Sequence, residues 1–216
     1  MTSVLVDNWG LFRSGFLTTI KLFLIAGVLS LAFGVFLALC RVSPVPALRR
    51  FGGGYVNGVR STPLTLVFAF LVFAAPKMGI ELPSFFWCAV TALSLYTGAF
   101  VCEVVRAGMN TVPVGQAEAA RSVGLSYAQV MGTVILPQAF KAIMPPLSSL
   151  AIALLKNTTI AAGFSVAEAG SIPAAMAERG ENQMATLVWI SVGFLILITP
   201  LALAQRWAER KVSVPT

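Results

Sequence analysis

The sequence contains no histidine, and only 11% of its 216 residues are charged. The lack of histidine removes the commonest metal ligand and general base, and soluble domains usually carry about a quarter charged residues. The three cysteines, Cys40, Cys88 and Cys102, lie within or beside apolar runs, so we expect free buried thiols and no disulfide framework or zinc site. These shortages argue against a soluble metalloenzyme.

Hydrophobic residues make up 57% of the chain, and this abundance points to a membrane protein surrounded by lipid. The net charge of +7 raises the question of nucleic acid, but the sequence has no basic stripe with interleaved aromatic residues. The lysines and arginines lie at the edges of apolar runs, where topology signals lie. We therefore predict no nucleic-acid partner.

Five apolar runs approach the roughly 20 residues that a transmembrane helix needs. We predict an all-α membrane protein with one transmembrane domain over residues 1–216 and spans at about 16–40, 56–76, 83–105, 143–165 and 185–205. The first run is too long for the apolar region of a cleaved signal sequence. The second is short, and the fourth is interrupted by Lys156.

Charge in the connecting loops predicts the orientation of the spans. The loop after the first span carries four arginines and no acid, and the third loop and the C-terminal tail are also basic. Because cytoplasmic loops are enriched in Lys and Arg, we predict that the N-terminus is outside and the C-terminus inside. Arg13 and Lys21 then lie toward the outer side, as exceptions to this pattern.

The loop over residues 109–137 has the features of an ordered docking segment. Pro113 suits a helix start, Gly124 suits the left-handed position that ends a helix, and Ser126 with Gln129 fits a capping box. We expect a short helix, a glycine corner and a second helix that ends at Pro137. The alternative is a simple connector, although loops of this length are usually functional or disordered.

The spacing in this loop resembles a known family. Glu118-Ala119-Ala120, Gly124 and Leu136-Pro137 resemble the EAA loop of ABC importer permeases, with Val134 where the family has isoleucine. Two further runs are similar to signatures of the polar amino-acid (histidine, glutamine and glutamate) subfamily, above all of actinobacterial glutamate-uptake permeases. These runs are Arg60-Ser61-Thr62-Pro63-Leu64 and Leu155-Lys156-Asn157-Thr158-Thr159.

The resemblance implies a type I ABC importer permease in the bacterial cell (inner) membrane, crossing it several times. It implies three partners: a cytoplasmic ABC ATPase dimer, a second permease subunit that is similar or identical, and an extracytoplasmic amino-acid-binding protein. It also implies that the loop forms a coupling helix that contacts the ATPase. The residues expected in this contact are Glu118, Ala119, Ala120, Arg121 and Gly124.

No Gly-x-x-x-x-Gly-Lys-Ser/Thr sequence occurs, so the chain has no phosphate-binding loop of that type. We expect a permease subunit that is not an enzyme and holds no cofactor or metal, with ATP and Mg on the partner ATPase. An ion-coupled secondary transporter or channel subunit is the alternative, but it usually shows internal repeats. A membrane-embedded enzyme needs a catalytic constellation that the spans do not supply.

Lys156 is the costliest residue of the predicted spans, because a lysine in mid-membrane costs roughly 2.5–3.5 kcal/mol. We predict that it lines the translocation pathway and meets a substrate carboxylate. The alternative is an ion pair with Glu103 or Glu168 that only fixes helix packing. Further pathway candidates are Asn157, Thr158, Thr159, Thr62, Tyr96 and Thr97; for the last three, packing or interhelical hydrogen bonding is the competing interpretation.

Overall fold

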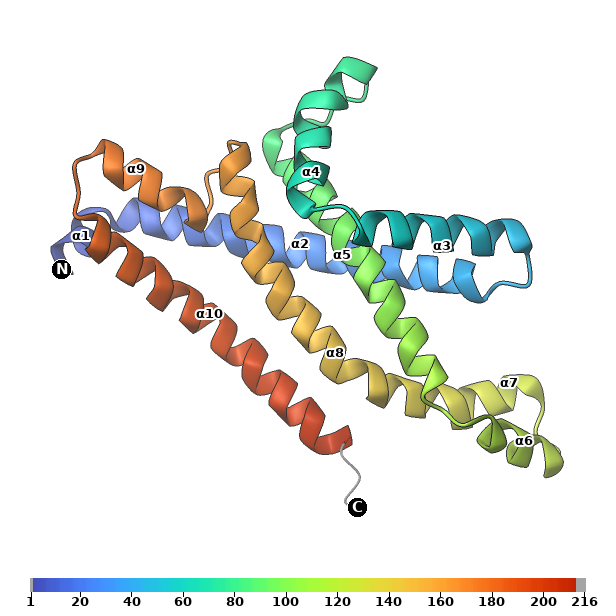
Figure 1. The fold of residues 1–216 in the computed structure, drawn as a ribbon. Helices are drawn as coiled ribbons and strands as arrows, with labels where there is room; N and C mark the ends of the chain where they lie inside the picture. The colour runs from blue at the N-terminus through green and yellow to red at the C-terminus, as the bar shows by residue number, and fades with distance from the viewer. Residues whose placement is uncertain (1, 213–216) are drawn as a thin grey trace.

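The computed structural model describes residues 2–212, and within that range it is helical without strands. Residues 1 and 213–216 of the predicted domain lie outside the described residues. Long helices dominate the molecule (Figure 1). The four longest are α2 (Trp9–Val42), α5 (Phe85–Asn110), α8 (Leu136–Asn157) and α10 (Gln183–Val212).

Four helical stretches are long and apolar enough to cross a membrane. They are Trp9–Val42, Phe85–Asn110, Tyr127–Phe164 and Gln183–Arg210, and they correspond to the predicted spans 16–40, 83–105, 143–165 and 185–205. At 34 residues, α2 is about 51 Å long. Because the hydrocarbon core is about 30 Å thick, α2 must tilt or extend beyond it.

The predicted second span, 56–76, is not one straight helix. Helix α3 (Pro46–Arg60) ends, and after a turn the chain continues as α4 (Leu64–Ala69) and a π-helical turn η1 (Phe70–Ala74), at 105° to α3. Pro63 lacks an N–H and disfavours helix in the residue before it, so the break falls at this point. An apolar run alone carries no signal of such an angle.

Proline does not end the second helix of the loop, so the prediction for Pro137 is wrong. Helix α7 (Tyr127–Gln129) passes into a π-helical segment η3 (Val130–Ile135), and α8 follows without interruption. A π segment widens the helix locally and shifts its hydrogen bonds to i→i+5. This widening gives the proline ring the space that a regular α-helix would deny it.

Short elements complete the chain, with α1 (Thr2–Asp7) and α9 (Ile172–Glu178) near the N-terminal end of α2 and α6 (Val114–Ser122) of the loop at the far end of the molecule (Figure 1). They also include a 3₁₀ continuation of α8, η4 (Thr158–Phe164). The others are η2 (Pro76–Met78) and η5 (Ala169–Ser171).

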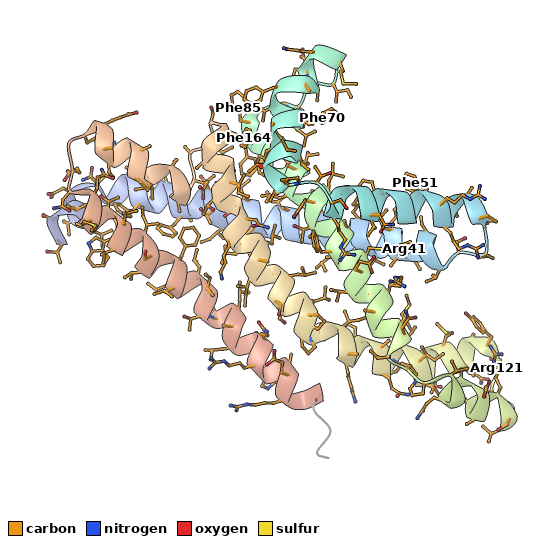
Figure 2. All side chains as sticks on the ribbon, in the orientation of Figure 1. Arg41, Phe51, Phe70, Phe85, Arg121 and Phe164 are labelled. Atoms are coloured by element: carbon orange, nitrogen blue, oxygen red, sulfur yellow. The ribbon has the colours of Figure 1, made fainter. Side chains whose placement is uncertain are left out.

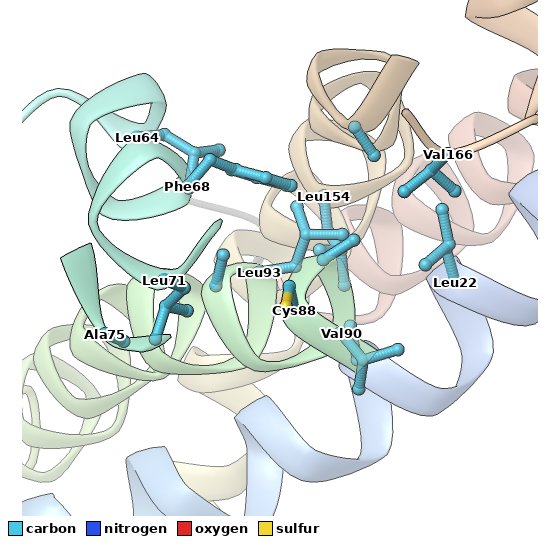
Figure 3. Packing of buried hydrophobic residues seen from close by; sticks show 14 residues of the cluster. Leu22, Leu64, Phe68, Leu71, Ala75, Cys88, Val90, Leu93, Leu154 and Val166 are labelled. Carbon is cyan, nitrogen blue, oxygen red and sulfur yellow. The ribbon is translucent and has the colours of Figure 1, made fainter. Parts of the chain in front are cut away.

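The main apolar core lies where α2, α4, α5 and α8 meet (Figure 3). Leu22, Leu93 and Leu154 come from three of these helices and are at most 3% exposed. Phe68 of α4 is fully buried and stacks on Phe164, with ring centroids 5.2 Å apart. The short arm after the bend is thus held against the long helices by aromatic packing.

Glycine sets the close approach of α2 to α5. A Cβ added at Gly34 would lie 2.5 Å from Val101 Cβ, and one added at Gly98 would lie 2.8 Å from Phe33 Cδ1. Small residues at helix contacts are typical of membrane bundles, where backbones approach closely. The paired α2 and α5 form the frame on which the site is built.

Candidate translocation site and coupling segment

The loop between α5 and α8 folds as an ordered pair of helices. Helix α6 ends in a Schellman motif: Gly124 N–H donates to Arg121 O at 3.0 Å, and Leu125 N–H donates to Ala120 O at 3.2 Å. Gly124 has φ +87°, the left-handed conformation that the sequence predicts. The capping box is also present, because Ser126 and Gln129 each accept from the other's backbone N–H.

This coupling segment, residues 109–137, presents most of its predicted contact residues outward. Glu118, Ala119 and Arg121 are exposed, whereas Ala120 is only 8% exposed. Arg121 lies at the tip of the molecule, remote from Phe85 at the start of α5 (Figure 2). The segment is thus an ordered helical projection at one end of the molecule, with the small residue Ala119 on its surface.

Three of the predicted pathway residues lie around one cavity between α5 and α8. The cavity has a volume of about 160 Å³, and its walls include Tyr96, Thr97, Phe100 and Asn157. Tyr96 and Phe100 pack ring against ring, with centroids 5.1 Å apart. Thr97 is buried. The cavity therefore combines a phenol, a hydroxyl and an amide with two aromatic faces.

The other members of the fourth-span cluster lie outside that cavity. Lys156 is exposed, and it forms no ion pair among residues 2–212. Thr158 is buried and donates to Leu155 O at 2.8 Å, while Thr159 donates to Lys156 O at 2.7 Å. Both hydroxyls are thus satisfied by the helix backbone, where α8 narrows to the 3₁₀ helix η4.

Thr62 does not face the cavity. Its hydroxyl donates to Gly58 O at 2.8 Å, in the last turn of α3, immediately before the 105° bend. Because this bond satisfies a carbonyl at the end of α3, the observed contact of Thr62 is structural. Thr62 and Pro63 together define where the second span changes direction.

Glu103 binds arginines and not Lys156, so the predicted alternative of a Lys156–Glu103 ion pair is wrong. Its carboxylate contacts Arg41, Arg106 at 3.1 Å and Arg60 at 3.4 Å. These residues come from α2, α5 and α3, and Arg41 is labelled beside α5 in Figure 2. Three guanidinium groups share one carboxylate, which leaves a formal charge of +2.

This arginine cluster adjoins the cavity wall. The guanidinium of Arg60 lies 5.6 Å from the centroid of the Phe100 ring, within the range of a cation–π contact. Arg106 Nε is buried and has no hydrogen-bond partner among the described residues. The site thus holds positive charge and a buried N–H donor, unpaired within residues 2–212, near the cavity.

Sequence reasoning missed this cluster as a site. Arg41 and Glu103 each lie at the predicted cytoplasmic edge of an apolar run, so both are expected at the same depth in the membrane. That shared depth is the sequence signal from which an ion pair between them could have been predicted. Arg60 stands directly before Ser61-Thr62-Pro63, and only the bend brings it to α5. Pairing across three helices depends on packing that no local pattern encodes.

Glu168 is the second predicted partner of Lys156, and it too is occupied elsewhere. It lies beyond the fourth span and is fully buried, accepting from Thr19 Oγ1 at 2.8 Å and Gly170 N–H at 2.6 Å. Burial raises the pKa of the Glu168 carboxyl above its usual 4.5, while these hydrogen bonds oppose the shift. Its role in the structure is to fix the outer loop on α2.

The structure thus combines a bundle of candidate membrane-spanning helices, a cavity with three polar side chains and an ordered helical projection. Residues 30–214 match the model of the family described as "Binding-protein-dependent transport system inner membrane component". The chain belongs to this family, and it is a multi-pass inner-membrane protein. Such subunits work with an ATPase and a binding protein.

Named relatives and solved structures agree with that membership. The chain is 42% identical over 211 residues to the glutamate transport system permease protein GluC of Corynebacterium glutamicum, covering 92% of both chains. It is 33% identical over 219 residues to the probable glutamine ABC transporter permease protein GlnM of Bacillus subtilis, covering 97% of both.

Among solved structures, one described as an amino acid ABC transporter with histidines has a TM-score of 0.89 at 28% identity, covering 96% of both chains. The MetNI methionine ABC transporter in inward-facing conformations has a TM-score of 0.75 at 21% identity, covering 96% of this chain and 99% of that one. The second likeness shows the shared fold alone.

Proposed function

We propose that this chain is the translocating subunit of an ATP-driven importer of glutamate or another polar amino acid. The names of the relatives at 42% and 33% identity support an amino-acid substrate, and the first supports glutamate. We propose that ATP and Mg bind to the partner ATPase, since this sequence has no phosphate-binding loop of the Gly-x-x-x-x-Gly-Lys-Ser/Thr type. The chain itself then supplies the pathway and the mechanical joint.

The arginine cluster beside the cavity is the observation that supports an acidic substrate. Its formal charge of +2 lies at the cytoplasmic edge of the spans, beside the cavity. A passing carboxylate is attracted by that charge, and Arg60, whose guanidinium lies over the Phe100 ring of the cavity wall, is placed to receive it. A neutral or basic side chain gains nothing there.

Lys156 supports a pathway between two permeases. It is exposed on the single chain within the fourth span, and lipid contact would cost roughly 2.5–3.5 kcal/mol. A second, similar or identical permease subunit that faces Lys156 across a wet pathway removes this cost. Lys156, with Asn157 beside it, then meets a substrate carboxylate, and Tyr96 and Thr97 line the same route.

The coupling segment transmits ATPase motion in this proposal. Glu118, Ala119 and Arg121 contact the ATPase, while Ala120 and Gly124 keep the helix and its corner rigid. Closure of an ATPase dimer on ATP would move two coupling segments together and open the pathway outward, and hydrolysis would reset it. An extracytoplasmic binding protein delivers the amino acid to the open state.

Uptake of radiolabelled amino acids tests this function in cells that express the chain with its ATPase and binding protein. We expect glutamate uptake that depends on ATP, and Lys156→Met is expected to reduce it at an unchanged amount of complex. Uptake of basic amino acids alone would refute the acidic substrate. Full rate and affinity in Lys156→Met would refute the pathway role of Lys156.

An ion-coupled transporter or channel is the other class that the polar spans allow. Family membership favours the ATP-driven importer over it. Uptake that survives removal of the ATPase and follows an ion gradient would restore this second candidate.

A further inference from the structure

A groove on the outer half of the molecule lies between α2 and α10 and has a volume of about 270 Å³. Its walls are two helical stripes: Trp9, Phe12 and Phe16 of α2, and Trp189, Val192, Gly193, Ile196 and Leu197 of α10. Gly193 lies in the second stripe, where an added Cβ would come within 2.2 Å of Phe16 Cζ. The absent side chain lets the Phe16 ring pack directly on α10. We call this hollow the outer groove.

Arg13 is the single charged residue of the outer groove. It is exposed, and no hydrogen bond or ion pair joins it to any residue of the range 2–212. The nearby polar contacts are complete without it: Asn8 donates to Glu181 at 3.0 Å and accepts from Arg179 at 2.6 Å. The guanidinium of Arg13 therefore lies at the edge of the apolar outer groove, and its N–H donors have no partner among the described residues.

The position of Arg13 fits the level of lipid headgroups. The orientation places the start of α2 at the outer surface, where basic residues are under-represented. Trp9 and Trp189 line the same groove, and tryptophan gathers at membrane–water interfaces. Arg13 thus lies beside aromatic residues typical of the interface, at the level where lipid phosphates lie.

The length of the groove matches an acyl chain. From Trp189 to Leu197 the α10 stripe rises about 12 Å, and half of a bilayer's hydrocarbon core is about 15 Å. Ile196, in this stripe, is 66% exposed, so the groove is not closed by the chain itself. A free phosphate would use Arg13 but leave the apolar walls unused.

We propose that the outer groove binds an anionic phospholipid, whose acyl chain lies between α2 and α10 and whose phosphate meets Arg13. A zwitterionic lipid offers the same phosphate with a compensating cation, so it binds more weakly. A second copy of the chain would cover the apolar walls but leave the guanidinium of Arg13 without an anion, at a cost.

Native mass spectrometry of the purified complex with its ATPase tests this, with phosphatidylglycerol or phosphatidylcholine added in turn. We expect preferential retention of phosphatidylglycerol, reduced about fivefold by Arg13→Gln, as loss of one basic contact near a membrane surface predicts. Lys21→Gln is the matched control, because Lys21 is exposed on the same helix but does not line the groove. It should leave retention unchanged.

Ile196→Trp fills the groove and keeps Arg13, and it should lower retention of both lipids. Size-exclusion profiles of each variant show whether the complex is intact. Equal retention in wild type and Arg13→Gln would overturn the proposal, as would an equal loss in Lys21→Gln or no loss in Ile196→Trp. A disulfide that forms between two Ile196→Cys copies, with no retained lipid, would show a subunit interface and overturn it as well.

Discussion

The glycine corner of the coupling segment gives the sharpest test of how ATPase motion reaches the spans. Gly124 has φ +87°, and its N–H donates to Arg121 O at 3.0 Å. An L-residue with a side chain pays about 1–2 kcal/mol in the left-handed conformation. Gly124→Ala should therefore favour other conformations of the corner by that amount, which corresponds to a five- to thirtyfold shift.

Gly124→Pro is the stronger perturbation, because proline fixes φ near −65° and removes the donor. It abolishes the corner, whereas Gly124→Ala weakens it. Gly115→Ala is the matched control: Gly115 lies in α6 with no atom within 4 Å of an added Cβ, and alanine there favours helix by about 1 kcal/mol.

The assay is the amount of ATPase that co-purifies with each variant, together with ATP-driven uptake. We expect near wild-type binding for Gly115→Ala, reduced binding for Gly124→Ala and almost none for Gly124→Pro. Because the corner is remote from the main core, each variant should keep its thermal stability in detergent. Full ATPase binding by Gly124→Pro would refute the coupling role of this segment.

Three further predictions concern stability, each measured by thermal unfolding in detergent. Glu103→Gln leaves three arginines without their carboxylate and should lower the free energy of unfolding by about 3 kcal/mol. The control Glu178→Gln changes an exposed acid and should alter that free energy by less than about 0.5 kcal/mol. Equal effects of the two variants would refute the importance of the arginine cluster. The raised pKa of Glu168 means that its protonated form stabilises the fold, so wild-type stability should fall as the pH rises above 4.5. Glu168→Gln should remove that fall, and an unchanged pH profile would contradict the burial argument. Gly34→Ala should lower the free energy of unfolding by about 1–3 kcal/mol, because the added methyl group overpacks α2 on α5. Gly27→Ala should be tolerated, because the nearest atom to an added Cβ lies at 3.7 Å. A larger loss of stability in Gly27→Ala than in Gly34→Ala would refute the proposed helix contact.

Features encoded within a few residues were predictable from the sequence. Long apolar runs gave four of the helices, because bilayer thickness sets their length. The left-handed Gly124 and the capping box at Ser126 follow from backbone sterics and local hydrogen bonds. The family resemblance depended on this same loop, and the match to residues 30–214 confirms it.

Features that depend on several helices at once were not predictable. The 105° bend before Leu64 and the passage of the helix through Pro137 both require packing that supports an unusual turn. Lys156 had two acids as plausible partners, yet Glu103 lies among arginines and Glu168 is held by Thr19. Residue chemistry alone does not tell which helices are neighbours.

The central claim is that this chain couples ATP hydrolysis by a partner to import of an acidic amino acid. ATPase activity of the reconstituted complex in proteoliposomes tests it most directly, across binding proteins loaded with acidic, neutral or basic amino acids. The account predicts strong stimulation by a glutamate-loaded binding protein, and loss of that stimulation in Gly124→Pro. Stimulation by basic amino acids without any by glutamate, or stimulation that survives in Gly124→Pro, would contradict it.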